Sequence, residues 1–356
     1  MPLINKSWEE WDMVVLLRAV VASAIAAVTT FAGGAHADPV EDFYKGKQLR
    51  LVIGYTPGGG YDIYGRIAAE YLGRFIPGNP AIIPQNMPGA GSVVAARYMY
   101  GLAAKDGTVL AILAQTLPLD TLIQGEKAGF KMSEMRYIGR LVDNIDFGMG
   151  HHPDKSPFKT FEDLRQKQVV AAATAGASPA NIFPTALNRL AGTKIKILVG
   201  YPGSQDMILA LERGEVDLVG ANGLASTMVR NPEWITKGER VIVYQAALKR
   251  HPLLPNVPTL EEVGLDATGK ATLRAIAGSS EIGRSILATP GVPMERLAAL
   301  RKAFGAMIGD KMFRETMAQR RIIIEPASGE ELDRIVEETS KLPEDVVRII
   351  AEIVKG

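Results

Sequence analysis

Short runs of β-branched and other apolar residues alternate along this chain with longer segments in which apolar residues recur every three or four positions. The short runs predict buried strands, and the longer segments predict helices. The predicted strands occupy residues 51–53, 82–83, 109–113, 169–173, 195–199, 218–221, 241–245 and 322–324. Strands that alternate with helices are typical of α/β domains with a mostly parallel sheet.

The alternation falls into two regions, which predicts two α/β lobes. A stretch rich in glycine and charged residues at 137–157 separates them and is a candidate crossing between lobes. Residues 251–258 carry three prolines and predict an extended return linker. We expect a hinge near residues 141–147 and 245–258. The predicted division is a first part of lobe 1 at 38–144, lobe 2 at 145–247, and a return to lobe 1 with C-terminal helices at 248–356.

The N-terminus resembles a secretory signal peptide. Residues 14–31 are apolar except for Arg18 and two threonines, and Ala35-His36-Ala37 fits a small-x-small cleavage pattern. The apolar stretch after Arg18 is shorter than the ~20 residues needed to span a bilayer. Residues 1–12 are acidic where a signal should be basic, so Met13 is a second candidate start. We expect export, with residues 1–37 removed by cleavage after Ala37, and a periplasmic mature protein.

Charge and cysteine content exclude several classes of protein. The chain has 40 Lys and Arg against 39 Asp and Glu, and residues 1–37 hold two basic and three acidic residues, so the mature net charge is +2. Such a small charge argues against a nucleic-acid partner or a polybasic membrane patch. Cysteine is absent, which excludes thiolate catalysis and cysteine metal sites. The pair His151-His152 is interpreted as part of a solvated loop, and we expect neither a cofactor nor a metal.

The most informative stretch runs from a predicted strand through Gly58-Gly59-Gly60 into a helix that begins near Tyr61. Glycines allow backbone N–H groups to approach a ligand, and the helix N-terminus adds unpaired donors and partial positive charge. A P-loop is excluded because Arg66-Ile67 stands where Lys-Ser/Thr is required. We expect Asp62 to cap the helix and pair with Arg66. The candidate ligand-binding residues of this turn are Thr56, Pro57, Gly58, Gly59, Gly60, Tyr61 and Asp62.

Further turns follow other predicted strands and can face the same cleft, because ligands of open α/β sheets collect at the carboxyl ends of the strands. The second glycine turn contributes the candidates Gly89, Ala90, Gly91 and Ser92. In the second lobe, polar or small residues follow three strands, at 174–178, 201–204 and 222. Together these turns predict a small polar ligand held by short side chains and main chain.

These segments together resemble one known family, the substrate-binding receptors of tripartite tricarboxylate transporters, also called Bug-type receptors. The resemblance rests on short segments that occur in family order: 55–62 with Arg66, 86–92, 201–204 with 210–217, and 254–264. It implies a two-lobed, type II-like periplasmic-binding-protein fold and a carboxylate held by the glycine turns. The ligand would be a di- or tricarboxylate, an aromatic acid or an acidic amino acid. In the second lobe, the resemblance implies that Thr174, Ala177, Ser178 and Asn222 face the ligand.

The resemblance also implies membrane permease subunits as partners, and we expect a monomeric receptor. The chain departs from the family pattern at residues 270–293, where an aromatic-containing stretch is usual, and after Glu325. An exported α/β enzyme acting on an organic acid is the main alternative, although G-x-S-x-G and HExxH motifs are absent. A ligand sensor for a membrane signalling partner is a third hypothesis.

Overall fold

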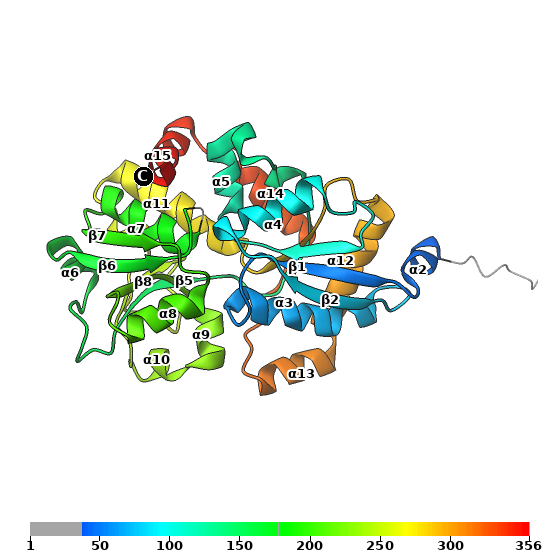
Figure 1. Cartoon of the computed structure of the whole chain (residues 1–356), viewed down its shortest axis with the longest axis horizontal. Helices are drawn as coiled ribbons and strands as arrows, with labels where there is room; N and C mark the ends of the chain where they lie inside the picture. The colour runs from blue at the N-terminus through cyan, green and yellow to red at the C-terminus, as the bar shows by residue number, and fades with distance from the viewer. Residues whose placement is uncertain (1–37, 177, 356) are drawn as a thin grey trace, which may run out of the picture.

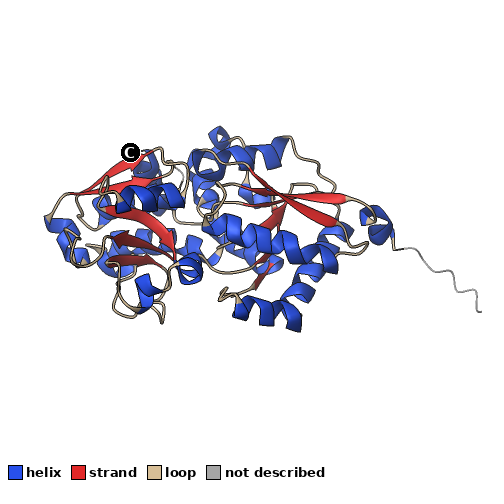
Figure 2. Ribbon diagram, turned by 60° about the horizontal axis from the view of Figure 1, so that its bottom comes forward, coloured by secondary structure: helices blue, strands red, loops and turns tan. Residues whose placement is uncertain are grey.

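The computed structural model describes residues 38–355 except Ala177, so the predicted signal peptide lies outside the described residues. Two lobes lie side by side along the long axis of the molecule, each built around its own β-sheet (Figure 1). Helices cover the sheets of both lobes (Figure 2). This architecture confirms the expected two-lobed α/β fold.

The first lobe contains a six-stranded sheet in the order β11-β4-β10-β3-β1-β2. Its strands are β1 (Gln48–Ile53), β2 (Ala81–Asn86), β3 (Val109–Ile112), β4 (Arg136–Arg140), β10 (Ser285–Ala288) and β11 (Ala327–Ser328). Its helices are α2 (Pro39–Tyr44), α3 (Gly60–Tyr71), α4 (Val93–Gly101), α5 (Leu117–Gln124), α12 (Met294–Gly309), α13 (Lys311–Gln319) and α14 (Gly329–Thr339). The short strand predicted at 322–324 does not form; Ile322 instead packs its side chain on the core, and β11 follows it.

The second lobe contains a five-stranded sheet in the order β7-β6-β8-β5-β9. Its strands are β5 (Asp146–Gly150), β6 (Val169–Ala173), β7 (Ile195–Val199), β8 (Leu218–Gly223) and β9 (Ile242–Ala246). The helices associated with it are α6 (Phe161–Gln166), α7 (Pro179–Leu190), α8 (Ser204–Glu212), α9 (Leu224–Arg230), α10 (Glu233–Thr236), α11 (Ala267–Ala277) and α15 (Glu344–Lys355).

Each sheet has an internal strand that runs against both of its neighbours. In the first lobe, β10 is antiparallel to β3 and β4, and in the second lobe β5 is antiparallel to β8 and β9. The edge strand β11 is also antiparallel to its neighbour β4. Strands β10 and β5 directly follow a passage of the chain between the lobes. A strand that enters from the cleft must run away from it, whereas β1, β3, β6 and β8 run toward it. Their carboxyl ends therefore meet at the cleft, where a ligand site is expected.

Both faces of the first sheet are buried at its centre, which explains why the central strand β3 is a continuous apolar run. Leu51 and Ile53 join one hydrophobic core with α3 and α12, whereas Val52 points to the opposite core with α4 and α14. This alternation follows from the two-residue period of side chains along a strand.

Residues 248–356 are shared between the lobes, which differs from the predicted return to lobe 1. Leu273 and Ile276 of α11 and Ile350 and Ile353 of α15 belong to the same hydrophobic core as the second sheet. The physical reason is that the buried apolar faces of these two helices pack against α7 and against each other. The chain returns to the first sheet at β10 and leaves it again after α14.

Two of the passages between the lobes, at residues 141–144 and 280–284, are hydrogen-bonded to each other. The N–H of Arg284 donates to the carbonyl of Val142 at 2.9 Å, and the N–H of Asn144 donates to Ser280 at 3.1 Å. The predicted second hinge segment at 245–258 instead packs on the second lobe, where the side-chain amide of Gln245 donates to the carbonyl of Leu254 at 3.0 Å. The segment 245–258 therefore does not connect the lobes, whereas 141–144 and 280–284 do.

Candidate ligand-binding cleft

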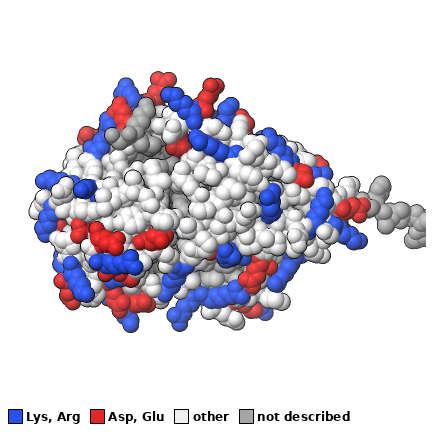
Figure 3. Space-filling model, in the orientation of Figure 1, with Lys and Arg blue, Asp and Glu red and all other residues white. Residues whose placement is uncertain are grey.

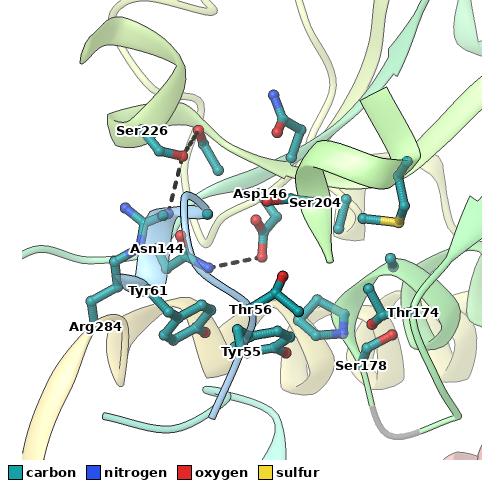
Figure 4. Close-up of a pocket in the computed structure, with 18 residues that line it drawn as sticks. Tyr55, Thr56, Tyr61, Asn144, Asp146, Thr174, Ser178, Ser204, Ser226 and Arg284 are labelled. Atoms are coloured by element: carbon teal, nitrogen blue, oxygen red, sulfur yellow. Dashed lines mark hydrogen bonds between the residues drawn. The ribbon is translucent and has the colours of Figure 1, made fainter. Parts of the chain in front are cut away.

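A cavity enclosing about 550 Å³ of empty space lies between the two lobes. The first lobe contributes its glycine turn, and the second lobe contributes strand-end turns. Asn144 and Arg284, from the paired segments between the lobes, line it together with Asp146 at the start of β5. Its lining residues include Tyr55, Thr56, Gly59, Gly60, Tyr61, Asn144, Asp146, Thr174, Ser178, Ser204, Asn222, Gly223, Ser226 and Arg284 (Figure 4).

The first glycine turn brings the N-terminus of α3 to the cavity. Gly59 is the N-cap residue and makes no side-chain cap hydrogen bond, so the first backbone N–H groups of a 12-residue helix are available to an anion. Gly58 adopts a φ of +88°, a conformation that favours glycine. Thr56, Gly59, Gly60 and Tyr61 line the cavity as the sequence predicted, whereas Pro57 and Gly58 are not among its lining residues.

Asp62 supports the turn from behind and is not among the residues that line the cavity. Its carboxylate accepts hydrogen bonds from the N–H of Gly58 at 2.8 Å, from Arg66 Nε at 2.9 Å and from Asn86 Nδ2 at 2.9 Å. Burial alone would raise the pKa of Asp62, but the hydrogen bonds from Arg66, Gly58 and Asn86 outweigh it and lower the pKa. The expected pairing with Arg66 is present, while the helix cap is Gly59 rather than Asp62.

The second glycine turn lies beside the main cavity. Gly89, Ala90 and Gly91 line a neighbouring hollow of about 600 Å³ that shares Thr56 and Thr174 with it. Ser92 is buried and does not face either space. Its hydroxyl donates to the carbonyl of Gly54 and accepts from the N–H of Ala114, both at 3.2 Å, so it ties the two turns together.

In the second lobe, three of the four predicted residues line the cavity. Thr174, Ser178 and Asn222 do so, and Ala177 lies outside the described residues. The Thr174 hydroxyl is buried without a hydrogen-bond partner in the described part of the chain. Asn222 donates to Thr227 Oγ1 at 2.8 Å, which orients its amide. Ser204, from the turn 201–204 that the sequence placed at the cleft, also lines the cavity, whereas the sequence analysis did not identify Ser226.

Sequence analysis also missed the two charged residues of the cavity. Arg284 is only 2% exposed, and its Nε and Nη1 atoms have no hydrogen-bond partner among the described residues. Its Nη2 donates a long 3.4 Å hydrogen bond to Ser226 Oγ, and its guanidinium lies over the rings of Tyr61 and Tyr64 at 5.7 and 4.9 Å. The one sequence feature that could have pointed to Arg284 was its position in residues 270–293, the segment that departs from the family pattern.

Asp146 is the second charged residue, and it is 5% exposed. Its Oδ2 atom accepts from Asn144 Nδ2 at 3.0 Å (Figure 4). It also accepts from Gln115 Nε2 at 3.2 Å. Burial raises the pKa of Asp146 to about 7, against the opposing effect of the Arg284 charge. No sequence pattern marked it, because it lies in a glycine-rich stretch that was interpreted as a crossing loop.

Charged side chains are unevenly distributed over the surface shown in Figure 3. On the face shown in Figure 3, acidic and basic side chains are interspersed toward the margins, and the middle of the face is mostly uncharged.

Within the described residues, no group of three or more His, Cys, Asp or Glu could hold a metal ion. None of the described helices is long and apolar enough to cross a membrane.

Two α/β lobes joined by paired segments, with a polar cavity between them, define a two-lobed solute-binding protein. The chain belongs to the tripartite tricarboxylate transporter receptor family, whose model matches residues 66–352. It is 28% identical over 322 residues to the UPF0065 protein in the gbd 5' region of Cupriavidus necator, covering 85% of this chain and 87% of that protein. The family expected from the sequence is thereby confirmed.

Solved structures show the same fold. The periplasmic binding protein BugD superposes with a TM-score of 0.67 at 20% identity, covering 88% of this chain and 98% of BugD. MatC from Rhodopseudomonas palustris, solved with bound malate, also gives a TM-score of 0.67 at 20% identity, covering 85% of this chain and 99% of MatC.

Proposed function

We propose that this protein is an extracytoplasmic receptor that captures a small carboxylate between its lobes and delivers it to the membrane permease subunits of a tripartite tricarboxylate-type transporter. The observation that carries the proposal is the cavity itself, where the N-terminus of α3 and the buried guanidinium of Arg284 both favour an anion. Membership of the receptor family and the malate bound to MatC support the choice of a carboxylate.

Binding would be coupled to closure of the lobes. Gly59 of the first lobe and Ser204 of the second both line the cavity, and a Cβ at Gly59 would be 3.0 Å from Ser204 Oγ. A ligand that touches both lobes binds the closed form better, and it therefore shifts the population toward closure. The hinge for this motion is the pair of segments 141–144 and 280–284.

The receptor would bind its ligand without chemical change and act as a periplasmic monomer after cleavage behind Ala37. None of the described residues that line the cavity is His, Lys or Cys. The residue that comes nearest to an acid–base group is Asp146, and it lacks a His or Lys partner in that lining.

A binding screen tests this function. Thermal unfolding of residues 38–356 is measured with mono-, di- and tricarboxylates, and with neutral sugars and phosphate as controls. A ligand at 100 times its Kd adds about 2.7 kcal/mol to the free energy of unfolding, so a specific carboxylate should clearly raise the Tm. A shift from sugars or phosphate alone contradicts the proposal. Conversion of a bound acid, followed by NMR, would favour the enzyme alternative.

A further inference from the structure

Arg284 and Asp146 are opposite charges that share one buried cavity without pairing. Neither residue takes part in any ion pair of the described residues. An unpaired buried charge is costly, and a native protein normally compensates it with a partner. Here both groups line the cavity, so a bound ligand is the partner that each can acquire.

The guanidinium of Arg284 is held at the point where the lobes meet. A Cβ added at Gly60, in the first lobe, or at Gly223, in the second, would collide with Arg284 Nη2. The two glycines therefore make room for this side chain from both sides. The N-terminus of α3 begins at the same place, and its partial positive charge adds to that of the guanidinium. Nothing in the lining except Asp146 opposes this positive potential.

Asn144 separates the two charged groups. Its Nδ2 donates to Asp146, while its Oδ1 is buried without a hydrogen-bond partner in the described chain and lies on the side of Gly223 and Arg284. Figure 4 shows Asn144 between Arg284 and Asp146. Both amide hydrogen bonds to Asp146 go to Oδ2, so Oδ1 is the oxygen left to accept from a ligand.

We propose that the cavity selects carboxylates that also carry a hydroxyl or ammonium group, with the carboxylate paired to Arg284 and the hydroxyl or ammonium donating to Asp146. This inference rests on the proposed carboxylate receptor function and deepens it. Above pH 7, where Asp146 is mostly ionised, a ligand with only carboxylates would place a like charge or an apolar carbon against it, both of which are unfavourable. A ligand with a donor satisfies both buried groups at once.

The raised pKa of Asp146, about 7, agrees with this arrangement. Without a ligand, burial disfavours the charged form of this carboxyl, and the nearby Arg284 charge only partly compensates. An ammonium or hydroxyl donor stabilises the ionised carboxylate, so ligand binding and loss of the Asp146 proton should occur together.

Isothermal titration calorimetry at pH 7.5 with matched ligand pairs tests the inference. Malate and aspartate are compared with succinate, which lacks the hydroxyl and the ammonium. The wild type should bind at least one of the substituted acids roughly 10- to 100-fold more tightly than succinate, the usual value of a hydrogen bond to a charged group. Asp146→Asn should reduce that ratio several-fold, because the substituted acids lose an acceptor and succinate no longer meets a like charge.

Variants of Arg284 test the other contact. Arg284→Gln should weaken every carboxylate by roughly 100-fold, and Arg284→Lys should recover part of the loss because the charge is retained. Arg320→Gln is the matched control, since Arg320 forms an exposed ion pair with Glu70 on α3, outside the cavity lining. Circular dichroism and thermal unfolding verify that each variant is folded. If Arg284→Gln does not fold, the carboxylate affinity of Arg284→Lys tests the contact with Arg284. The affinity ratio between substituted acids and succinate in Asp146→Asn tests the contact with Asp146.

The outcomes separate the inference from the proposed function. If the wild type binds carboxylates without preferring either substituted acid over succinate, the receptor function stands and the selection by Asp146 is overturned. Wild-type affinity in the Arg284→Gln protein overturns the anchoring role of Arg284. If the wild type binds no carboxylate at all, the proposed function fails, and this inference fails with it.

Discussion

The backbone N–H of Leu141 donates a hydrogen bond to the carbonyl oxygen of Arg284 at 3.1 Å. This bond joins the two segments that run between the lobes, and the Arg284 side chain lines the cavity between them. The residue best placed to attract an anion is therefore part of the hinge. A ligand that holds the Arg284 side chain acts directly on the segment about which the lobes would rotate.

Replacing Gly60 by a residue with a side chain should displace the Arg284 side chain. In Gly60→Val the new Cβ would collide with the guanidinium and lie 3.0 Å from Ser226 Oγ. We expect carboxylate affinity to fall at least roughly tenfold, the size of one lost charge-assisted contact. Titration calorimetry measures it. An affinity equal to that of the wild type would show that the guanidinium does not need its observed position.

Gly305→Ala is the matched glycine control. Gly305 is exposed within α12, and a Cβ there meets no atom within 4 Å. Alanine loses less backbone entropy than glycine in a helix, so the free energy of unfolding should rise by about 0.5–1 kcal/mol with unchanged ligand affinity. Urea unfolding measures the change.

Removing the Asp62 carboxylate should loosen the first glycine turn. Asp62→Ala leaves the N–H of Gly58 and the amide of Asn86 without their acceptor. Unsatisfied buried donors cost about 1–3 kcal/mol each when water cannot reach them, so we expect unfolding to become easier by about that amount in total. Arg66→Ala should cost less, under about 1 kcal/mol, because the Arg66 side chain is half exposed. Equal losses in both variants would contradict a role for Asp62 in the turn.

Stability should depend on pH through Asp146. In the folded protein the pKa of this carboxyl is about 7, whereas in the unfolded chain it returns to its ordinary value of 3.8. Between these values the folded state holds the extra proton, so its stability falls as pH rises, by at most about 1.4 kcal/mol per pH unit.

Asp146→Asn should remove this dependence and be more stable than the wild type at pH 8. Asp143, whose pKa burial and the neighbouring Glu325 charge raise to about 7, retains its own contribution in both proteins. Urea unfolding at pH 5 and pH 8 measures the difference. The same difference between variant and wild type at both pH values would argue against titration of Asp146 in this range.

The C-terminal helix should contribute to the stability of the second lobe. Ile350 of α15 is 1% exposed within the second-lobe core. Ile350→Ala should lower the free energy of unfolding by about 2–5 kcal/mol through lost burial and the resulting cavity. Arg348→Ala on the exposed face is the control and should change it by less than about 0.5 kcal/mol. A loss below 1 kcal/mol for Ile350→Ala would indicate that α15 packs only loosely.

The sequence predicted the strands that consist of short, mainly apolar runs. Residues 169–173 and 195–199 coincide with β6 and β7, and the run at 51–53 lies within β1. It also located the glycine turn at α3, because a strand followed by glycines and a helix specifies a local backbone shape.

The sequence analysis did not predict strands β4, β5 and β10. For β4 and β5 the structure shows the physical reason. Gly139 of β4 and Gly148 of β5 stand where large aromatic rings approach the sheet, and a Cβ there would collide with Phe304 and Tyr244. Glycine in a linear sequence indicates a loop, and only the packed structure reveals the ring that requires it.

By itself, the sequence determined the class of fold, the family and the first glycine turn that lines the cavity, because these depend on residues close together in the chain. The tertiary structure decided how α11 and α15 divide between the lobes and which charges enter the cavity. Asp146 and Arg284 are far apart in sequence and carry no local pattern. They meet only because the chain runs between the lobes twice at the same place, and burial there changes what each charge can do.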